Sequence, residues 1–397
     1  MNNYLDEAYA LMDTTRALRR DFHRHPELGF QEVRTAGIVA QELRKLGLEV
    51  ITGVAGTGVI ALLEGTRPGP VVMARFDMDA LPIQEENSSE YASQIPGVMH
   101  ACGHDGHIAV GLTVARLLHE HAQDLAGTVK FVFQPAEEGL GGAEKMLAEG
   151  VLNNPRPDIA YGLHLWNEKP LGWLGITSGP VMSASDIFQI TVTGRGGHGA
   201  LPHQTVDPVI GAAQIITALQ SIVSRNISPM QAAVISATSL HAGEAFNVIP
   251  VTATIKGTIR TFDPDVRATL RQRFTEVVTG VGQALGCHVE IELQTLTPAV
   301  VNDLQITETV YRKAAELFPD NQIDSSYRSM VSEDMAYLMQ EIPGCYFFVG
   351  SSNPGKGLDA PHHHPRFDID EEALPRAAAL MASAISGYGG IASQRVE

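Results

Sequence analysis

The chain has 397 residues, 44% of them hydrophobic and 18% charged, which is the composition of an ordinary soluble globular protein with more than one domain. Its 28 Lys and Arg residues and 45 Asp and Glu residues leave a formal net charge of −17. That acidity argues against nucleic acid or an anionic membrane surface as a partner. No apolar run reaches the ~18–20 residues of a membrane span, and we expect no secretory signal. The three cysteines are scattered and odd in number, which favours a reducing, cytoplasmic setting over a disulfide framework.

The first part of the chain alternates between predicted helices and strands. Helices are expected over 5–20 and 33–46, and short buried strands over 59–63 and 71–74. The second strand runs into Asp77 and Asp79, which point to the same side of the chain because they lie two residues apart. The mouth of a parallel sheet is where α/β proteins place their chemistry. An Asp-rich turn that caps the strand is the structural alternative.

A dense group of potential metal ligands occupies the stretch 99–107, Met-His-Ala-Cys-Gly-His-Asp-Gly-His. Cys102 and His104 are one residue apart, so their side chains can converge in a looping backbone. A thiolate and an imidazole suit a borderline-soft divalent ion. Gly103 and Gly106 relax the backbone, and the apolar pattern after His107 predicts a helix. A polar loop with one buried cysteine is the alternative.

Polar residues follow or interrupt the next two predicted strands. The strand at 129–133 leads into Glu137 and Glu138, whose adjacent carboxylates splay apart, so one can bind a metal while the other faces a substrate or water. The strand at 159–165 contains His164. A solvated acidic turn and a satisfied core histidine are the structural alternatives, and the repeated β/α pattern favours a functional interpretation.

The pattern changes near residue 183 and changes back near 298. Alternating strands over 188–193, 233–239 and 251–261, with helical runs near 206–225 and 264–286, predict a β-α-β-β-α-β unit inserted at 184–298, an α+β open-faced sandwich. The flanking residues, 1–183 and 299–397, predict an α/β domain with a mixed, mostly parallel sheet flanked by helices. Its last part contains a helix near 304–318, a strand at 346–349, the run His362-His363-His364 and a final helix from about Asp370.

A series of motifs resembles the M20 metallopeptidase family, above all its amidohydrolase branch of hippurate hydrolases, aminoacylases and auxin–amino acid conjugate hydrolases. The resemblance covers nearly the whole chain. It implies a catalytic domain with one or two divalent ions, interrupted by a lid domain that often mediates dimerisation, so we expect a homodimer or higher homo-oligomer. Zn, Mn, Co and Ni all tolerate mixed N, O and S ligands. The motifs, in chain order, are RFDMDALP, HACGHDGH, QPAEEG, GLHLW, GGHGALPH, NVIP, GTIR, SEDM and HHHPRFD.

The resemblance also implies a role for individual residues. The general base matches Glu137, and the carboxylate that orients a ligand matches Asp79. His198 matches a donor to the developing oxyanion, often supplied by the neighbouring subunit. In the branch, the last ligand is the His two before the Pro of an H-x-P-x-F stretch, which is His363 here. The metal ligands implied are Cys102, His104, Glu138, His164 and His363. Apart from the resemblance, Asn247 and Arg260 are candidates for binding the substrate carboxylate, because Asn and Arg side chains are good donors to that group.

Together these residues predict hydrolysis of a small-molecule N-acyl amino acid to a carboxylic acid and a free amino acid. A divalent ion activates water and polarises the amide carbonyl, and a neighbouring carboxylate carries the proton. Three alternatives stay open. They are a dipeptidase or carboxypeptidase with the same centre, a cysteine hydrolase that uses Cys102 with His104, and a non-catalytic metal-binding or scaffold protein.

Overall fold

The computed structural model describes residues 3–393, which form two compact units. The first unit contains the chain up to Val181, together with Val301–Arg328 and the chain from Asp334 onward. The second contains Met182–Val300 and the short segment Ser329–Glu333. Within the part of the chain that the structure describes, none of the helices has both the length and the apolar character needed to cross a bilayer.

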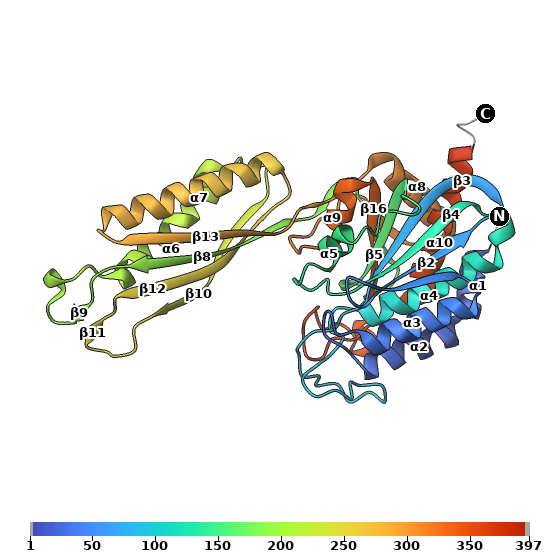
Figure 1. The fold of residues 1–397 in the computed structure, drawn as a ribbon, viewed down its shortest axis with the longest axis horizontal. Helices are drawn as coiled ribbons and strands as arrows, with labels where there is room; N and C mark the ends of the chain where they lie inside the picture. Colours follow the sequence, from blue (N-terminus) through green and yellow to red (C-terminus); the bar gives the residue numbers. More distant parts are fainter. Residues whose placement is uncertain (1–2, 394–397) are drawn as a thin grey trace. The chain divides into compact units, whose positions relative to one another are not determined.

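The first unit is built on an eight-stranded mixed sheet (Figure 1), whose order is β1-β2-β4-β3-β5-β16-β6-β15. The central strands β4, β3, β5 and β16 pair in parallel, whereas β1 and β2 join their neighbours in antiparallel fashion. At the other end of the sheet, β6 is antiparallel to β16 and parallel to β15. The strands are β1 (Glu49–Val54), β2 (Gly58–Glu64), β3 (Arg67–Asp77), β4 (Ala126–Gln134), β5 (Ile159–Pro170), β6 (Trp173–Gly175), β15 (Gln322–Asp324) and β16 (Gly344–Ser352).

Helices pack against this sheet and against one another. The helix expected over 5–20 is two helices, because the chain breaks at Leu11, which caps both of them. The final helix begins at Ala373 rather than near Asp370, and α5 and α9 were not predicted. The helices of this unit are α1 (Tyr4–Ala10), α2 (Met12–Arg24), α3 (Val33–Lys45), α4 (His104–Glu120), α5 (Gly142–Ala148), α8 (Leu304–Leu317), α9 (Met335–Glu341) and α10 (Ala373–Ser393).

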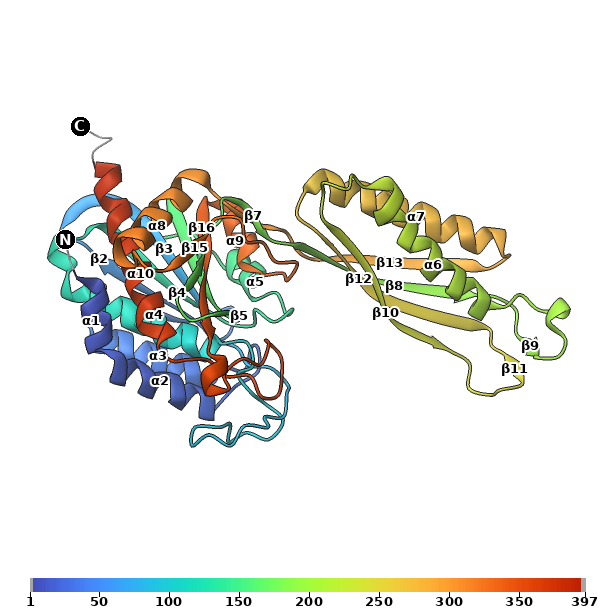
Figure 2. The same cartoon turned by 180° about the vertical axis from the view of Figure 1, so that it is seen from behind.

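Helix α4 is the central helix of the first unit (Figure 2). It contacts the sheet through β3, β4 and β5, and it contacts the helices α1, α2, α3 and α10 as well. A helix enclosed in this way must be apolar around its whole circumference, and Ile108, Val110, Val114 and Leu117 are all fully buried. The core therefore holds α4 rigidly, and with it the polar residues of its first turn.

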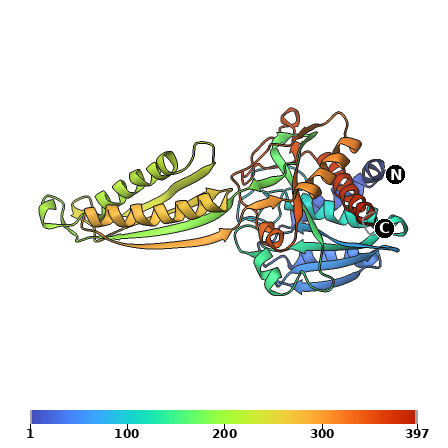
Figure 3. The ribbon, with the colours of Figure 1, turned by 90° about the horizontal axis from the view of Figure 1, so that it is seen from above.

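The second unit is a four-stranded antiparallel sheet in the order β10-β12-β8-β13, with α6 and α7 side by side over it (Figure 3). Both helices begin with an Asp cap followed by Pro, Asp207-Pro208 and Asp263-Pro264, which is a favourable helix start. The elements are β8 (Ala184–Thr193), α6 (Pro208–Asn226), β10 (Ala233–Ala242), β12 (Thr252–Thr261), α7 (Pro264–Ala284) and β13 (His288–Thr297).

Two small strand pairs complete the fold. In the second unit, β9 (Gly197–His198) pairs with β11 (Val248–Ile249). Where the chain leaves and re-enters the first unit, β7 (Gly179–Met182) pairs with β14 (Val300–Asn302). Each unit has its own apolar core.

Candidate metal centre

The predicted ligands of the first unit come together because they follow or lie on neighbouring strands. Asp79 comes just after β3, Glu137 and Glu138 just after β4, and His164 lies within β5. These three strands are adjacent and parallel, so the polar residues near their carboxyl ends meet at one edge of the sheet. His104 begins α4, and Gly103 before it has a φ of 97°, a left-handed conformation that favours glycine.

Hydrogen bonds orient the two buried histidines in the same way. The Nδ1 of His104 donates to the carbonyl oxygen of Asp79 at 2.9 Å, and the Nδ1 of His164 donates to that of Leu165 at 2.8 Å. Since a carbonyl can only accept, both rings carry a proton on Nδ1, so Nε2 is the ring nitrogen left to bind an ion. The Nε2 of His164 lies 3.5 Å from the Cys102 sulfur. This is how proteins orient metal-binding imidazoles.

Glu138 and His363 form the other side of the cluster. The main-chain N–H of Glu138 donates to Oδ2 of Asp79 at 3.0 Å, and its Oε1 lies 3.3 Å from Nε2 of His363. His363 has a φ of 64°, and its own N–H donates to the carbonyl of Ala101. The segment with the three histidines is therefore tied to the loop that carries Cys102.

The other two histidines of the 362–364 run point elsewhere. The Nε2 of His362 donates to the Leu165 carbonyl at 3.1 Å, and its ring packs 4.8 Å from the Trp166 ring. The Nδ1 of His364 accepts the N–H of Arg366 at 3.0 Å. Of the three, His363 is the one whose ring lies beside Glu138.

These side chains offer two overlapping sets of ligand atoms. The first is Cys102, His104 and His164, the second is Cys102, Glu138 and His363, and the atoms of each set lie within 4.8 Å of one another. Nε2 of His104 is buried without a hydrogen-bond partner, an arrangement that is costly unless something binds it. A thiol, imidazoles and a carboxylate are suitable ligands for a divalent transition-metal ion, so the residues fit such an ion.

Burial and neighbouring charges shift the pKa values of the candidate ligands. Burial raises the pKa of the Cys102 thiol well above its usual value, and the Glu138 carboxylate adds to this. Burial lowers the pKa of His164, whereas the hydrogen bond to Glu138 raises the pKa of His363. Burial also opposes protonation of His104, but the charge of Asp77 raises its pKa overall. A thiolate at position 102 is favoured only when a cation supplies compensating charge.

A neighbouring group of titratable residues supports the cluster. Asp77, His104 and His107 also bring ligand atoms within 4.8 Å of one another. Both nitrogens of His107 are used, however: Nδ1 donates to Asp77 at 2.6 Å, and Nε2 accepts the N–H of Leu165 at 2.9 Å. Arg75 then donates to Asp77 at 2.7 Å and to Asp334 at 3.0 Å. His107 thus braces the strand next to His164 and has no lone pair left for an ion.

No role was predicted from the sequence for His107, Arg75 or Asp334, and Asp77 was noted only as the first of two strand-end aspartates. All four lie in the motifs RFDMDALP, HACGHDGH and SEDM, so a signal was present. It could not be interpreted because the partners of Arg75 are distant in sequence, with Asp334 lying 259 residues away.

The remaining predicted residues belong to the second unit. His198 is exposed on β9, and its Nδ1 accepts the N–H of Ala200 at 3.1 Å. Asn247 is also exposed, and its carbonyl accepts the N–H of Gly199 at 2.8 Å, so these two candidates lie close together. Arg260 is on a different strand, β12, where its guanidinium donates to the hydroxyl of Ser332 at 2.8 Å.

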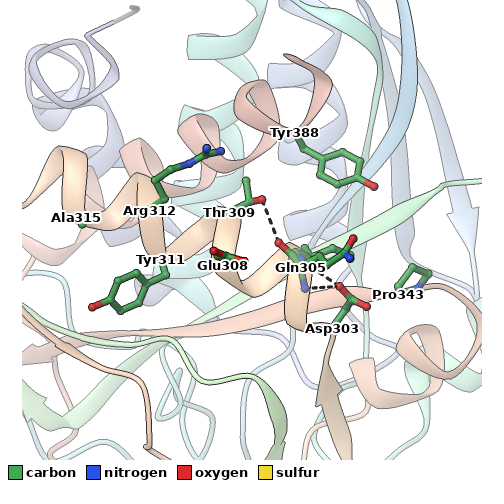
Figure 4. A pocket seen from close by; sticks show the side chains of 10 residues that line it. Asp303, Gln305, Glu308, Thr309, Tyr311, Arg312, Ala315, Pro343 and Tyr388 are labelled. Carbon is green, nitrogen blue, oxygen red and sulfur yellow. Dashed lines mark hydrogen bonds between the residues drawn. The ribbon is translucent and has the colours of Figure 1, made fainter. Parts of the chain in front are cut away.

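A cavity of about 770 Å³ lies elsewhere in the first unit, along α8 (Figure 4). Asp303, Tyr311, Arg312 and Tyr388 are among the residues that line it, and none of its lining residues belongs to the ligand sets. This cavity is therefore separate from the candidate metal centre.

Comparison with known proteins agrees with this geometry. Residues 73–387 match the model of Peptidase family M20/M25/M40, and the chain belongs to that family. It is 40% identical over 366 residues to the N-acetylcysteine deacetylase of Bacillus subtilis, covering 92% of this chain and 94% of the relative. It is 38% identical over 369 residues to thermostable carboxypeptidase 1 of Saccharolobus solfataricus, covering 92% and 93%.

A solved structure shows the same fold. The Bacillus subtilis YXEP protein, described as a dinuclear metal-binding peptidase of the M20 family, superposes with a TM-score of 0.83 at 36% identity, covering 95% of this chain and 98% of that one. The predicted family and α/β fold class are therefore confirmed, and the chain is a hydrolase of the M20 type.

Proposed function

We propose that this protein is a metal-dependent amidohydrolase that cleaves N-acyl amino acids to a carboxylic acid and a free amino acid. The observation that carries the proposal is the position of Glu137, whose carboxylate lies within 4.8 Å of the ligand atoms of both His104 and Glu138. The two relatives support the same bond type. An N-acetylated amino acid and a peptide cut by a carboxypeptidase both present an amide whose amine side is one amino acid with a free carboxylate.

Cys102, His104, Glu138, His164 and His363 would hold one or two divalent ions, with Zn²⁺, Mn²⁺, Co²⁺ and Ni²⁺ as candidates. A bound ion supplies Lewis acidity, which polarises an amide carbonyl and makes water more acidic. Glu137 accepts a proton from the attacking water and delivers it to the leaving amine. Asp79 keeps the ligands in place, because its side chain accepts the N–H of Glu138 and its carbonyl accepts from His104.

We further propose that the second unit, near residues 184–298, completes the site as a lid in a homodimer or higher homo-oligomer. His198 would donate to the developing oxyanion, and Asn247 and Arg260 would bind the substrate carboxylate. The exposure of His198 and Asn247 supports this, because both are accessible to another surface. The free state of all three cysteines supports a cytoplasmic setting.

A hydrolysis screen of the purified, metal-supplemented protein tests the function. The substrates are N-acetyl and N-benzoyl amino acids, the matching amino acid amides without a free carboxylate, and dipeptides. We expect turnover of the N-acyl amino acids and little turnover of the amides. Faster turnover of dipeptides than of any N-acyl amino acid would instead assign a dipeptidase or carboxypeptidase, and turnover of none would assign a non-catalytic metal-binding protein.

The cysteine-hydrolase alternative is disfavoured by the surroundings of Cys102. A nucleophilic cysteine needs a lowered pKa, whereas burial raises the pKa of this thiol. Treatment with a chelator separates the two chemistries, because a thiol enzyme keeps its activity after metal removal. We expect activity to be lost and to return when a divalent ion is added back.

A further inference from the structure

Glu32 is a fully buried carboxylate that neither the fold nor the proposed chemistry explains. It precedes α3, but the N–H groups at the start of that helix are capped by Glu27, which accepts from Arg34 and Thr35. The two carboxylate oxygens of Glu32 have other partners. Oε1 accepts the main-chain N–H of Ala136 at 2.9 Å, and Oε2 accepts the hydroxyl of Thr57 at 2.5 Å.

The conformation of Ala136 is unusual for a residue with a side chain. Its φ is 56°, in the left-handed region, where a Cβ is disfavoured and surrounding contacts must hold the backbone. Ala136 is fully buried, and both of its peptide groups are bonded: its N–H to Glu32, and its carbonyl to the N–H of Gly142 at 3.1 Å. The 2.9 Å hydrogen bond from the Ala136 N–H to Glu32 is therefore one of the two hydrogen bonds that hold this strained turn.

This turn aims the two carboxylates that follow it. Glu137 accepts the N–H of Asp334 at 3.3 Å. Glu138 donates its N–H to Asp79, and its Oε1 lies beside Nε2 of His363. The side chains of Glu137 and Glu138 can reach these different partners only if the backbone of Ala136 keeps a fixed orientation. Relaxation of Ala136 to an ordinary negative φ would rotate both side chains away from their partners.

We propose that Glu32 is a positioning residue for the metal centre, which holds Ala136 in its left-handed conformation and so aims Glu137 and Glu138. The inference rests on the proposed function in assigning Glu137 and Glu138 their roles as base and ligand. Glu32 itself contacts no ligand set and acts through the backbone. Burial raises the pKa of Glu32, so an uncharged acceptor of the same shape is a close substitute.

The experiment uses four substitutions in the full chain, one of them combined with another. Zn²⁺ affinity is measured by competition with a chromophoric chelator, and kcat is measured on the preferred substrate. Glu32→Met removes the acceptor and keeps an unbranched side chain of similar length. Glu32→Gln keeps an acceptor for the N–H of Ala136. Thr57→Val is the matched control, because it removes the other hydrogen bond of the same carboxylate and leaves the Ala136 contact intact. Ala136→Gly makes a positive φ accessible without a Cβ.

We expect Glu32→Met to lose roughly 10–100-fold in both Zn²⁺ affinity and kcat, the usual effect of removing a group that orients a metal ligand. Glu32→Gln and Thr57→Val should stay within about threefold of the wild type, since each keeps an acceptor for Ala136. Adding Ala136→Gly to Glu32→Met should recover most of the lost affinity. A general loss of stability would not be rescued in this way.

The inference is wrong if Glu32→Met binds Zn²⁺ and turns over like the wild type, if Thr57→Val loses as much as Glu32→Met, or if Ala136→Gly restores nothing. If Glu32→Met does not fold, Glu32→Asp takes its place, because it withdraws the carboxylate from Ala136 by one methylene. The affinity series needs no activity. If the wild type binds Zn²⁺ but hydrolyses no N-acyl amino acid, the proposed function is wrong. The positioning role of Glu32 is then tested by the Zn²⁺ affinities of the variants alone.

Discussion

The main-chain N–H of Asp334 donates a hydrogen bond of 3.3 Å to Oε1 of Glu137. The Asp334 carboxylate is itself held by Arg75, by Gln134 and by the N–H of Ala143 at 2.6–3.0 Å. Glu137 is therefore oriented by a rigid, buried group. Such preorganisation is what a carboxylate needs in order to transfer a proton along a defined path.

Glu137→Gln should retain the fold and the metal and lose about 10²–10⁴-fold in kcat, because the amide cannot accept the proton. Steady-state kinetics and metal analysis of the same sample check this. Asp79→Asn serves as the comparison and should lose roughly 10–100-fold, since it disturbs only the orientation of a ligand. Near-normal turnover of Glu137→Gln would mean that another group is the base.

Cys102→Ala and His363→Ala should each lower the metal content, because each removes a donor from the ligand sets. The measurement is metal stoichiometry by mass spectrometry after gel filtration. His364→Ala is the matched control, since His364 is next in sequence but accepts the N–H of Arg366 instead. Full metal content in both ligand variants would refute the assignment.

Arg75→Met should lower the free energy of unfolding by about 3–5 kcal/mol, because it leaves the buried carboxylates of Asp77 and Asp334 without their counter-charge. Urea denaturation checks this. Arg34→Met is the control: its ion pair with Asp21 is partly exposed, with side chains 38% and 35% accessible, and should be worth about 0–1 kcal/mol. Equal losses in the two variants would contradict the expectation.

The stability of the first unit should fall between pH 6.5 and pH 9 through His23. Burial and the charge of Arg19 lower the pKa of His23, but the charge of Asp105 and the hydrogen bonds to Asp105 and Glu85 outweigh them and raise it from 6.5 to about 9. A raised pKa stabilises the folded state fully below pH 6.5, and this stabilisation is lost as the pH rises through 9.

Each pH unit in that window is worth up to about 1.4 kcal/mol for one such group. The measurement is the free energy of unfolding at several pH values for the wild type and for His23→Gln. The difference between the two profiles should shrink as the pH rises. A difference that does not change with pH would show that His23 does not titrate in this range.

A mixture of His198→Ala and Glu137→Gln should regain activity if His198 acts on the neighbouring subunit. Each variant alone is expected to be inactive or nearly so, and a mixed dimer contains one intact combination of His198 and Glu137. Subunit exchange is followed by native mass spectrometry alongside activity. A mixture that exchanges and stays inactive would place any role of His198 within its own chain.

The family, the α/β class and the candidate ligands could all be predicted from the sequence, because these depend on local patterns and motifs. Cys102 and His104 are close along the chain, and Glu137, Glu138 and His164 follow or lie in strands whose apolar runs are evident. The choice of His363 among three histidines came from the family resemblance, in which the ligand stands two residues before the Pro of an H-x-P-x-F stretch. Short or half-exposed elements were missed, such as β1, in which no residue is fully buried.

The residues that support the site could be identified only from contacts between distant parts of the folded chain. Arg75 hydrogen-bonds to Asp334, which lies 259 residues away in the sequence, and Glu32 accepts a hydrogen bond from Ala136, which lies 104 residues away. The left-handed φ of Ala136 could not be read from an alanine, because that residue favours the opposite conformation and is held here by contacts from distant segments. Local sequence specifies which groups can bind and react, but the orientation of those groups depends on long-range packing and hydrogen bonds, which exist only once the chain has folded.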